Sequence, residues 1–347
     1  MKLHHLYLTL LCIVFVSTSN ISYGNNISNE IAFLNNDNKW KINTENQISS
    51  GKSLRIRLYL EGAMLNAPNV FGSDGKRLMR DDLRVSPFTG INYIPLTDPY
   101  QKTIKFVNLA VKHKHVGVGS LPQYSAITDS ASVFGVTGEN AIVDWVFVEI
   151  RSANNNKQVI ATRSGLLQRD GHVVDVDGVS DLLFPDLADS EFHVAVFHRN
   201  HLGCMSLPVS GGDLIDFTNP QTPVFDFGST MGGRLNYTGL CRKTNQYGYA
   251  MLWAGNFNAD SAIKFDPPKD DHNILMMETL GFVESGNFSK GALGYFQGDY
   301  DMNSKIKYDN PSDDKNMLFA QVLLYDLNLQ LLGNFTYFIE QVPTRNP

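Results

Sequence analysis

Apolar and polar residues alternate along the first half of the chain with the two-residue period of β-strands. Residues 54–60 place aliphatic side chains at every second position, and residues 192–198 form another strand-like segment. Residues 144–151 form a nearly continuous β-rich run, as in a strand that is covered on both faces. Several such segments are separated by Gly, Pro and Asp, with no long amphipathic helix between them. The pattern predicts a mainly β fold, with a β-sandwich over residues 51–209.

One hairpin is predicted in detail. The apolar residues 166–167 and 173–174 flank the pair Asp170-Gly171. Asp-Gly between two apolar segments favours a type I′ turn, in which both central residues adopt positive φ. We therefore expect two antiparallel strands joined at this pair.

The composition divides the chain into segments. Lys2, the apolar run 6–16 and the small residues around Ser22 and Gly24 have the layout of a secretory signal. That run is too short to span a bilayer, and no later stretch reaches about 18 apolar residues, so no membrane span is expected. The predicted segments are a signal peptide (1–24), a flexible lead-in (25–50), the β-sandwich (51–209), a linker (210–250), a small α-helical loop–helix domain (251–335) and a tail (336–347).

Charge and cysteine content restrict the function further. The formal net charge is −6 with scattered Lys and Arg, which argues against nucleic acid as a partner. After removal of the signal, Cys204 and Cys241 remain. An oxidising compartment allows a disulfide between them, but the sequence leaves open whether they pair. We expect a secreted, extracellular protein, either free or associated with a cell surface.

The most informative feature is an internal duplication. Residues 255–275 match residues 298–318, and every matched pair lies 43 positions apart without a gap. Identities fall on Gly, Ser, Ile, Lys, Asp, Pro and Asn, and aromatic residues replace one another. Such a register over the whole segment indicates a repeated structural unit.

The repeated segment is rich in the oxygen side chains that Ca²⁺ prefers. In each copy these side chains occupy alternate positions 1, 3 and 5 of the loop, and a pair of acids follows later. The candidate ligands are Asn256, Asn258, Asp260, Asp270 and Asp271 in the first copy, and Asp299, Asp301, Asn303, Asp313 and Asp314 in the second. The late acids precede apolar runs and predict two helices with acidic N-termini. Ile263 and Ile306, at position 8, are expected to join the loops in a short β-contact.

Two departures distinguish these loops from a standard calcium loop. Position 6 is Ser261 or Ser304 where glycine eases a sharp turn, and position 12 is Pro267 or Asn310 where an acid closes the site. One acid of each later pair must therefore close the loop. The first copy carries neutral Asn at positions 1 and 3, so we expect the second site to bind more tightly. The alternative is a pair of polar turns that hold no metal.

The repeats and several upstream segments resemble known families. The duplicated loop–helix unit resembles dockerin-type calcium repeats, which are EF-hand-like, in a variant with a longer loop. Upstream, residues 60–63, 94–100, 144–151, 164–171 and 198–202 are similar to a module of secreted surface proteins of Bacteroidetes-type bacteria, often labelled hemagglutinin. The resemblance implies docking of the repeats on a cohesin-like protein.

Two other groups of residues suggest chemistry. His193, His198, Arg199 and His201 cluster at a strand end, which suggests a zinc or hydrolase site or, alternatively, a strand end whose Arg and Asn hold the backbone of a neighbouring loop. Asp170, Asp175 and Asp177 suggest the paired carboxylates of a glycosidase or, alternatively, turn-forming residues.

The sequence as a whole predicts a non-enzymatic, secreted, calcium-binding module for attachment, assembly or adhesion, with no catalytic residues. Its expected partner is a protein or glycan at a cell surface. An accessory docking component of an extracellular polysaccharide-degrading system is the first alternative. A hydrolase that uses the region of His198 and His201 is the second.

Overall fold

The computed structural model describes residues 31–34, 40–43, 51–101, 113–116, 125–185, 187–188, 190–282, 289–309 and 313–346. The chain forms two units, residues 1–49 and 50–347. The predicted signal peptide lies outside the described residues. In the first unit, strand β1 (Ile31–Leu34) pairs antiparallel with β2 (Trp40–Asn43), within the segment predicted as a lead-in.

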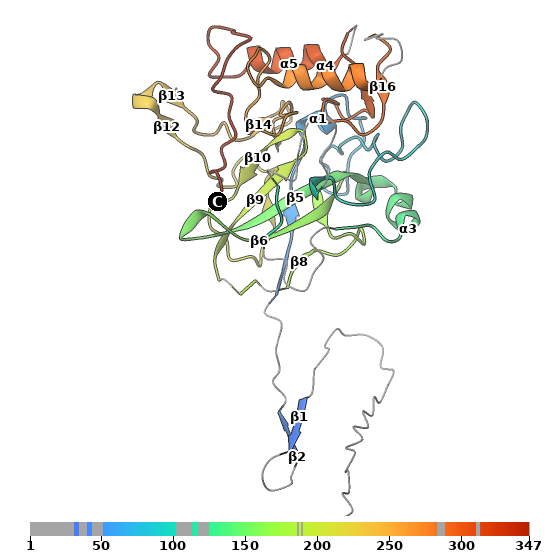
Figure 1. Cartoon of the computed structure of the whole chain (residues 1–347), viewed down its shortest axis with the longest axis vertical. Coiled ribbons are helices and arrows are strands. Elements are labelled where there is room, and N and C mark those ends of the chain that lie inside the picture. The colour runs from blue at the N-terminus through green and yellow to red at the C-terminus, as the bar shows by residue number, and fades with distance from the viewer. Residues whose placement is uncertain are drawn as a thin grey trace, which may run out of the picture. The chain divides into compact units, whose positions relative to one another are not determined.

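A curled seven-stranded sheet lies at the centre of the second unit (Figure 1). Its strand order is β10-β9-β5-β6-β7-β4-β11, and all neighbours are antiparallel except the parallel pair β4 and β11. The strands are β4 (Ile56–Arg57), β5 (Ile142–Ser152), β6 (Asn155–Gln168), β7 (His172–Val174), β9 (Phe192–His198), β10 (His201–Met205) and β11 (Ile215–Asp216). The mainly β fold predicted from the sequence is confirmed.

The remaining elements are short. They are β3 (Lys52–Leu54) paired with β8 (Leu182–Phe184), α1 (Glu61–Met64), η1 (Pro99–Gln101), α3 (Ser130–Gly135), η2 (Gly138–Asn140), β12 (Ser229–Thr230) paired with β13 (Leu235–Asn236), η3 (Met231–Gly233), β14 (Lys243–Thr244) paired with β15 (Ala250–Met251), α4 (Asp271–Phe282), β16 (Ala292–Leu293) paired with β17 (Lys305–Ile306), and α5 (Asp314–Leu323). Helices α4 and α5 lie together at one end of this unit (Figure 1).

Strand β5 is the centre of the core. Its residues from Ile142 to Arg151 are all buried, which matches a strand covered on both faces. Trp145 donates its indole N–H to the carbonyl of Pro95 (2.8 Å), and the hydroxyl of Tyr100 donates to the carbonyl of Trp145 (2.9 Å). The polar groups of Trp145 and Tyr100 therefore have partners, as burial requires.

The β6–β7 hairpin forms where it was predicted, but with another turn. Gly171 donates its N–H to the carbonyl of Gln168 (2.9 Å), so Arg169 and Asp170 are the central residues of the turn. Within this turn, only Gly171 adopts positive φ, at 95°. A three-residue loop closed by a left-handed glycine replaces the type I′ turn, because Asp170 uses its carboxylate to accept the N–H of His172 (3.0 Å).

The turn between β9 and β10 attaches both repeats to the sheet. The side chain of Asn200 donates to the carbonyls of Gln297 (3.0 Å) and Asp299 (2.9 Å). Its backbone carbonyl accepts the N–H groups of Gly255 (2.9 Å) and Asn256 (3.1 Å). One buried residue thus contacts the start of the first loop and the start of the second. This is the strand-end role that one interpretation of the sequence gave to the Arg and Asn of this region.

No helix among the described residues is both long and apolar enough to cross a membrane.

Replacing Asn200 should destabilise the whole second unit. Asn200→Ala leaves two buried carbonyls without donors, at a cost of roughly 1–3 kcal/mol each. We expect the free energy of unfolding in urea to fall by about 2–4 kcal/mol. Asn154→Ala, at an exposed turn, is the matched control and should change it by less than about 0.5 kcal/mol. Equal stabilities of the two variants would contradict this role of Asn200.

Candidate metal centre

The two repeats have the same local scaffold. In the first, Asp271 accepts the N–H of Phe257 (2.6 Å) on one carboxylate oxygen and the N–H of Lys264 (2.8 Å) on the other. In the second, Asp314 accepts the N–H of Tyr300 (2.8 Å) and of Lys307 (2.7 Å) in the same way. The first acid of each helix therefore closes the loop before it. The sequence duplication is a structural duplication.

The backbone of both loops turns through the same strained positions. Position 4 has φ of 55° in both Ala259 and Met302, and position 6 has φ of 74° in Ser261 and 69° in Ser304. These values lie in the left-handed region, which non-glycine residues rarely adopt. The serines at position 6 thus adopt a left-handed backbone conformation that glycine would adopt with less strain.

The first acid of each late pair, which precedes the helix, has a different role. Asp313 caps α5: its carboxylate accepts the backbone N–H of Asn316 (2.6 Å) and the side-chain amide of the same residue (2.8 Å). Asp270 makes the equivalent contacts with Asn273, at 2.8 and 3.0 Å. Helix capping occupies these carboxylates. Asp271 and Asp314, not Asp270 and Asp313, are the loop-facing acids.

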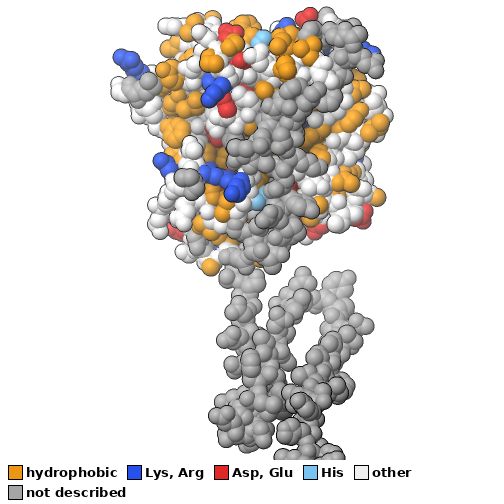
Figure 2. Space-filling view, in the orientation of Figure 1, with side chains coloured by type: hydrophobic (Ala, Val, Ile, Leu, Met, Phe, Trp, Pro, Cys, Tyr) orange, Lys and Arg blue, Asp and Glu red, His pale blue; other side chains and the backbone are white. Residues whose placement is uncertain are grey.

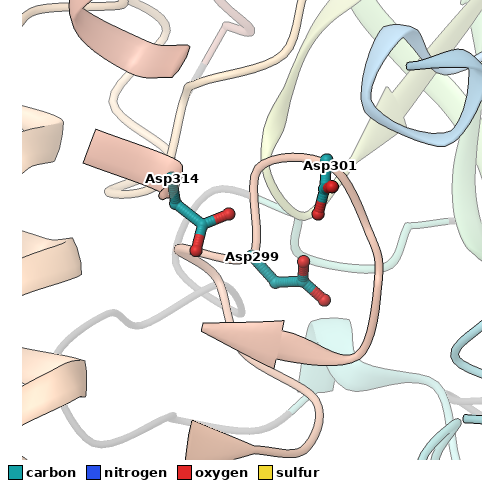
Figure 3. Close-up of side chains that lie close together, drawn as sticks. All are labelled: Asp299, Asp301 and Asp314. Atoms are coloured by element: carbon teal, nitrogen blue, oxygen red, sulfur yellow. The ribbon is translucent and has the colours of Figure 1, made fainter. Parts of the chain in front are cut away.

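Three acids converge in the second loop (Figure 3). Asp299, Asp301 and Asp314 each offer a carboxylate oxygen, and these oxygens all lie within 4.8 Å of one another. The three residues are 0%, 4% and 2% exposed. Asp299 also accepts the N–H groups of Asn303 and Ser304 (both 3.0 Å), which orients it. Asn303 uses its side-chain oxygen to accept the N–H of Lys305 (2.8 Å).

Burial makes this cluster electrostatically unfavourable when it is empty and ionised. Burial, reinforced by Asp301, raises the pKa of Asp299 well above its ordinary value. Burial, reinforced by Asp299 and Asp301, does the same to the pKa of Asp314. Burial also raises the pKa of Asp301. A cation between the carboxylates would remove both the repulsion and the cost of desolvation.

Arg80 belongs to this centre and was not predicted. Its Nη1 lies 3.0 Å from Oδ2 of Asp301, and its Nε and Nη2 lie 2.9 and 2.5 Å from Oδ2 of Asp82. Within the described structure, the other oxygen of Asp301, Oδ1, is buried and has no hydrogen-bond partner. Arg80 thus holds Asp301 by one oxygen, and the other oxygen is the one that could contact an ion.

The first loop has the same scaffold but fewer charges. Asn256, at position 1, is 1% exposed, and neither atom of its amide has a partner among the described residues. Asn258 accepts the N–H of Asp260 (2.9 Å) and donates to the carbonyl of Lys269 (3.1 Å). Asp260 is exposed and accepts the N–H of Ala262 (3.0 Å). In the described part of the chain, the second loop holds the one group of three acids close enough for an ion.

The loops do not pair with each other, so the expected contact between Ile263 and Ile306 is wrong. Ile263 donates its N–H to the carbonyl of Phe338 (2.9 Å), and Ile306 pairs with Ala292 in β16. Other segments occupy the edge of each loop, although both isoleucines are fully buried in one apolar cluster.

The repeats meet instead through an aromatic stack. The ring of His272, in α4, lies 4.4 Å from the ring of Phe265 and 5.4 Å from that of Tyr308, with interplanar angles of 11° and 16°. Nε2 of His272 lies 2.6 Å from the hydroxyl of Tyr308. Because Phe265 and Tyr308 are equivalent positions of the duplication, this contact joins the two copies directly.

The histidines near β9 form a buried chain of hydrogen bonds. Gly62 donates its N–H to Nε2 of His201 (3.1 Å), so Nδ1 of this ring carries the proton and can donate to Nδ1 of His198 (3.0 Å). Nε2 of His198 then donates to Asp144 (3.1 Å). Burial lowers the pKa of both histidines, which favours this neutral arrangement. His193 bonds to the carbonyl of Ser206 (2.8 Å) and lies outside the chain.

Asp144 anchors this network. Arg199 Nε lies 2.9 Å from Asp144 Oδ2, and Tyr295 donates its hydroxyl to Oδ1 (2.6 Å). Although burial alone would raise it, the ion pair with Arg199 and the bond from His198 lower the pKa of Asp144 to about 2. These groups form one connected network of hydrogen bonds at the strand end.

The other predicted acid cluster does not converge. Asp175 forms an ion pair with Arg163 (2.6 Å), and Asp177 accepts the N–H groups of Val179 and Ser180 (both 2.9 Å). Asp170 holds His172. These are the contacts of turn-forming residues.

Comparison with known proteins gives no match: no family model, curated protein or solved structure is significantly similar to the chain. The resemblance to dockerin repeats and to bacterial surface modules therefore stays a prediction.

One buried acid of α4 supports the second loop. Glu278 accepts the N–H groups of Gln297 (3.2 Å) and Gly298 (2.8 Å), directly before Asp299. Burial raises its pKa from 4.5 to about 7. A carboxyl whose folded-state pKa is raised binds its proton more tightly in the folded state, so stability is lost as the pH rises between the two values.

Glu278→Gln should remove this pH dependence. With calcium chelated, the free energy of unfolding of the variant, relative to wild type, should increase by up to about 3 kcal/mol between pH 4.5 and 7. Urea denaturation at several pH values measures the difference, in which the contributions of the histidines cancel. The matched control Glu191→Gln, at an exposed site, should show no trend. A constant difference for Glu278→Gln would refute the raised pKa.

Proposed function

We propose that the chain is a secreted, non-enzymatic, calcium-binding module in which the ion braces the second repeat. The buried group Asp299, Asp301 and Asp314 carries this proposal, because Oδ1 of Asp301 is buried beside two other acids and has no partner among the described residues. An unpaired buried carboxylate oxygen needs an ion or a proton. An irregular loop of carboxylate and amide oxygens suits Ca²⁺, which accepts variable geometry, better than Mg²⁺, which demands a regular octahedron.

The ion would act structurally. Asp314 is the first residue of α5, and Asp299 and Asp301 lie on the loop, so a shared ion would tie the helix to the loop. The loop also contacts the segment around Arg80, and Ser304 Oγ lies 2.8 Å from Ser86 Oγ. With the contact of Asn200 to Asp299, the ion would stabilise the junction between the repeats and the sheet.

The first loop would hold a second, weaker ion. Asn256 offers a buried amide oxygen with no partner in the described structure, and Asp271 offers a buried carboxylate. Burial, reinforced by Asp260, raises the pKa of Asp271 well above its ordinary value. Neutral amides at positions 1 and 3 give this site less negative charge than the second, and affinity follows the charge of the ligands.

The finer architecture is part of the same proposal. We assign the curled sheet to the β-sandwich class and the repeats to a dockerin-like, EF-hand-like unit with a lengthened loop. The apolar side chains Met277, Leu280, Phe319 and Leu324 are exposed on or next to α4 and α5, and Figure 2 shows hydrophobic side chains at this end of the molecule. An exposed apolar patch on the repeats favours docking on a protein at a cell surface, such as a cohesin-like partner. The same patch supports the alternative of an accessory component of a polysaccharide-degrading system.

Calcium should raise the melting temperature of the protein. An ion that binds only the folded state stabilises it by about 2.7 kcal/mol at a concentration of 100 times the dissociation constant. We expect a rise of roughly 5–10 °C by calorimetry when calcium replaces chelator. Asp299→Ala combined with Asp301→Ala should abolish most of the rise.

The duplication supplies the matched control. Asn256→Ala combined with Asn258→Ala changes the equivalent positions of the first loop and should leave most of the rise intact. Circular dichroism would confirm that both double variants fold. If chelator and the Asp299/Asp301 variant leave the melting temperature unchanged, calcium does not brace this loop.

Arg80→Lys should weaken calcium binding. Lysine keeps the positive charge but cannot bridge Asp82 and Asp301 with a planar fork. Loss of a residue that orients a ligand typically costs about 10–100-fold in metal affinity. Titration calorimetry of Arg80→Lys against Arg77→Lys, a control in the same segment, measures the difference. Equal affinities would show that Arg80 does not position Asp301.

A further inference from the structure

The two cysteines that follow the predicted signal lie together in the core. Cys204 is in β10 and Cys241 precedes β14, and both are buried in the same apolar cluster as free thiols. Their side chains hydrogen-bond to each other. No part of the proposed calcium site uses them.

The backbone around both residues is fixed by one shared segment. Phe225 donates its N–H to the carbonyl of Met205 (2.8 Å), next to Cys204. Arg242, next to Cys241, donates to the carbonyls of Thr222 (2.9 Å) and Phe217 (2.9 Å). Residues 217–225 therefore contact the residue that follows each cysteine, which places both cysteines beside the same segment.

We infer that Cys204 and Cys241 are joined by a disulfide in the exported protein. The inference rests on the proposed export, because a compartment that oxidises thiols must supply the oxidant. The oxidant is the disulfide of a thiol–disulfide exchange protein. The thiolate of one cysteine attacks a sulfur of that disulfide and displaces a thiolate, which gives a mixed disulfide. The second cysteine, as thiolate, attacks the first cysteine's sulfur in the mixed disulfide. This step forms the Cys204–Cys241 bond and releases, as a thiolate, the oxidant sulfur that was bonded to the first cysteine.

The reaction balances within this pair of molecules. Two cysteine thiols lose two electrons and two protons, and one disulfide of the oxidant gains both electrons and both protons and becomes a dithiol. Burial of both residues in the folded chain places the exchange before the core closes. The bond would then link β10 to the strand pair β14–β15, which leads into the first loop.

The bond can be detected on the full chain secreted into a bacterial periplasm. The purified protein is unfolded in denaturant, treated with iodoacetamide and weighed by mass spectrometry. We expect no added alkyl group without reductant, a mass lower than the thiol form by two hydrogen atoms, and two added groups after reduction. A peptide containing both cysteines should appear in a non-reducing digest. Two alkyl groups without reductant, or a disulfide-linked dimer, would overturn the inference.

A second measurement separates this bond from the calcium site. Reductant should lower the melting temperature of the wild-type protein by roughly 5 °C or more, because the closed loop restricts the unfolded chain. It should have no effect on Cys204→Ala combined with Cys241→Ala. If reductant changes neither protein, the inference fails. Calcium titration of the double variant reports on the proposed function independently, because neither cysteine contacts the acids of the second loop.

Discussion

The burial of three carboxylates in one loop is the constraint on which this structure depends. At about 4 Å, two like charges repel by about 4 kcal/mol at an effective dielectric constant of about 20, and desolvation adds to that cost. Arg80 offsets one of the charges, but Asp82 shares its guanidinium. Asp299 and Asp314 then need a proton or a cation.

The two repeats show which acids bond to the backbone and which positions change in charge between the copies. Asp271 and Asp314 make the same hydrogen bonds to their loops, and Asp270 and Asp313 cap the helices identically. These four positions hold the fold, so both copies keep an acid there. Positions 1 and 3 differ between Asn in the first copy and Asp in the second. The divergence changes the charge of the site without changing its shape.

The sequence alone predicted the features that depend on local patterns of residues. The burial of β5, the hairpin at Gly171 and the helices after each loop follow from periodicity and turn residues. The sequence could not show whether Asp313 or Asp314 faces the loop. A shift of one residue at the start of the helix decides which acid caps the helix and which acid bonds to the loop. Arg80 lies 221 positions from Asp301, and no local signal connects them. The pairing of Ile263 with Phe338 likewise depends on a distant segment.

In the proposed calcium site, proton and calcium binding would be linked through the same oxygens. Each raised pKa in the second loop means that an empty site takes up protons as it folds, and an entering ion must release them. Glu278 extends this linkage into α4, because it holds the backbone just before Asp299. Asn200 connects the second loop to the sheet, because its side chain donates a hydrogen bond to the carbonyl of Asp299. An ion in the second loop would thus affect the helix that follows the loop and the strand end that Asn200 joins to it, where the neutral histidine chain lies beside the ion pair of Asp144 and Arg199.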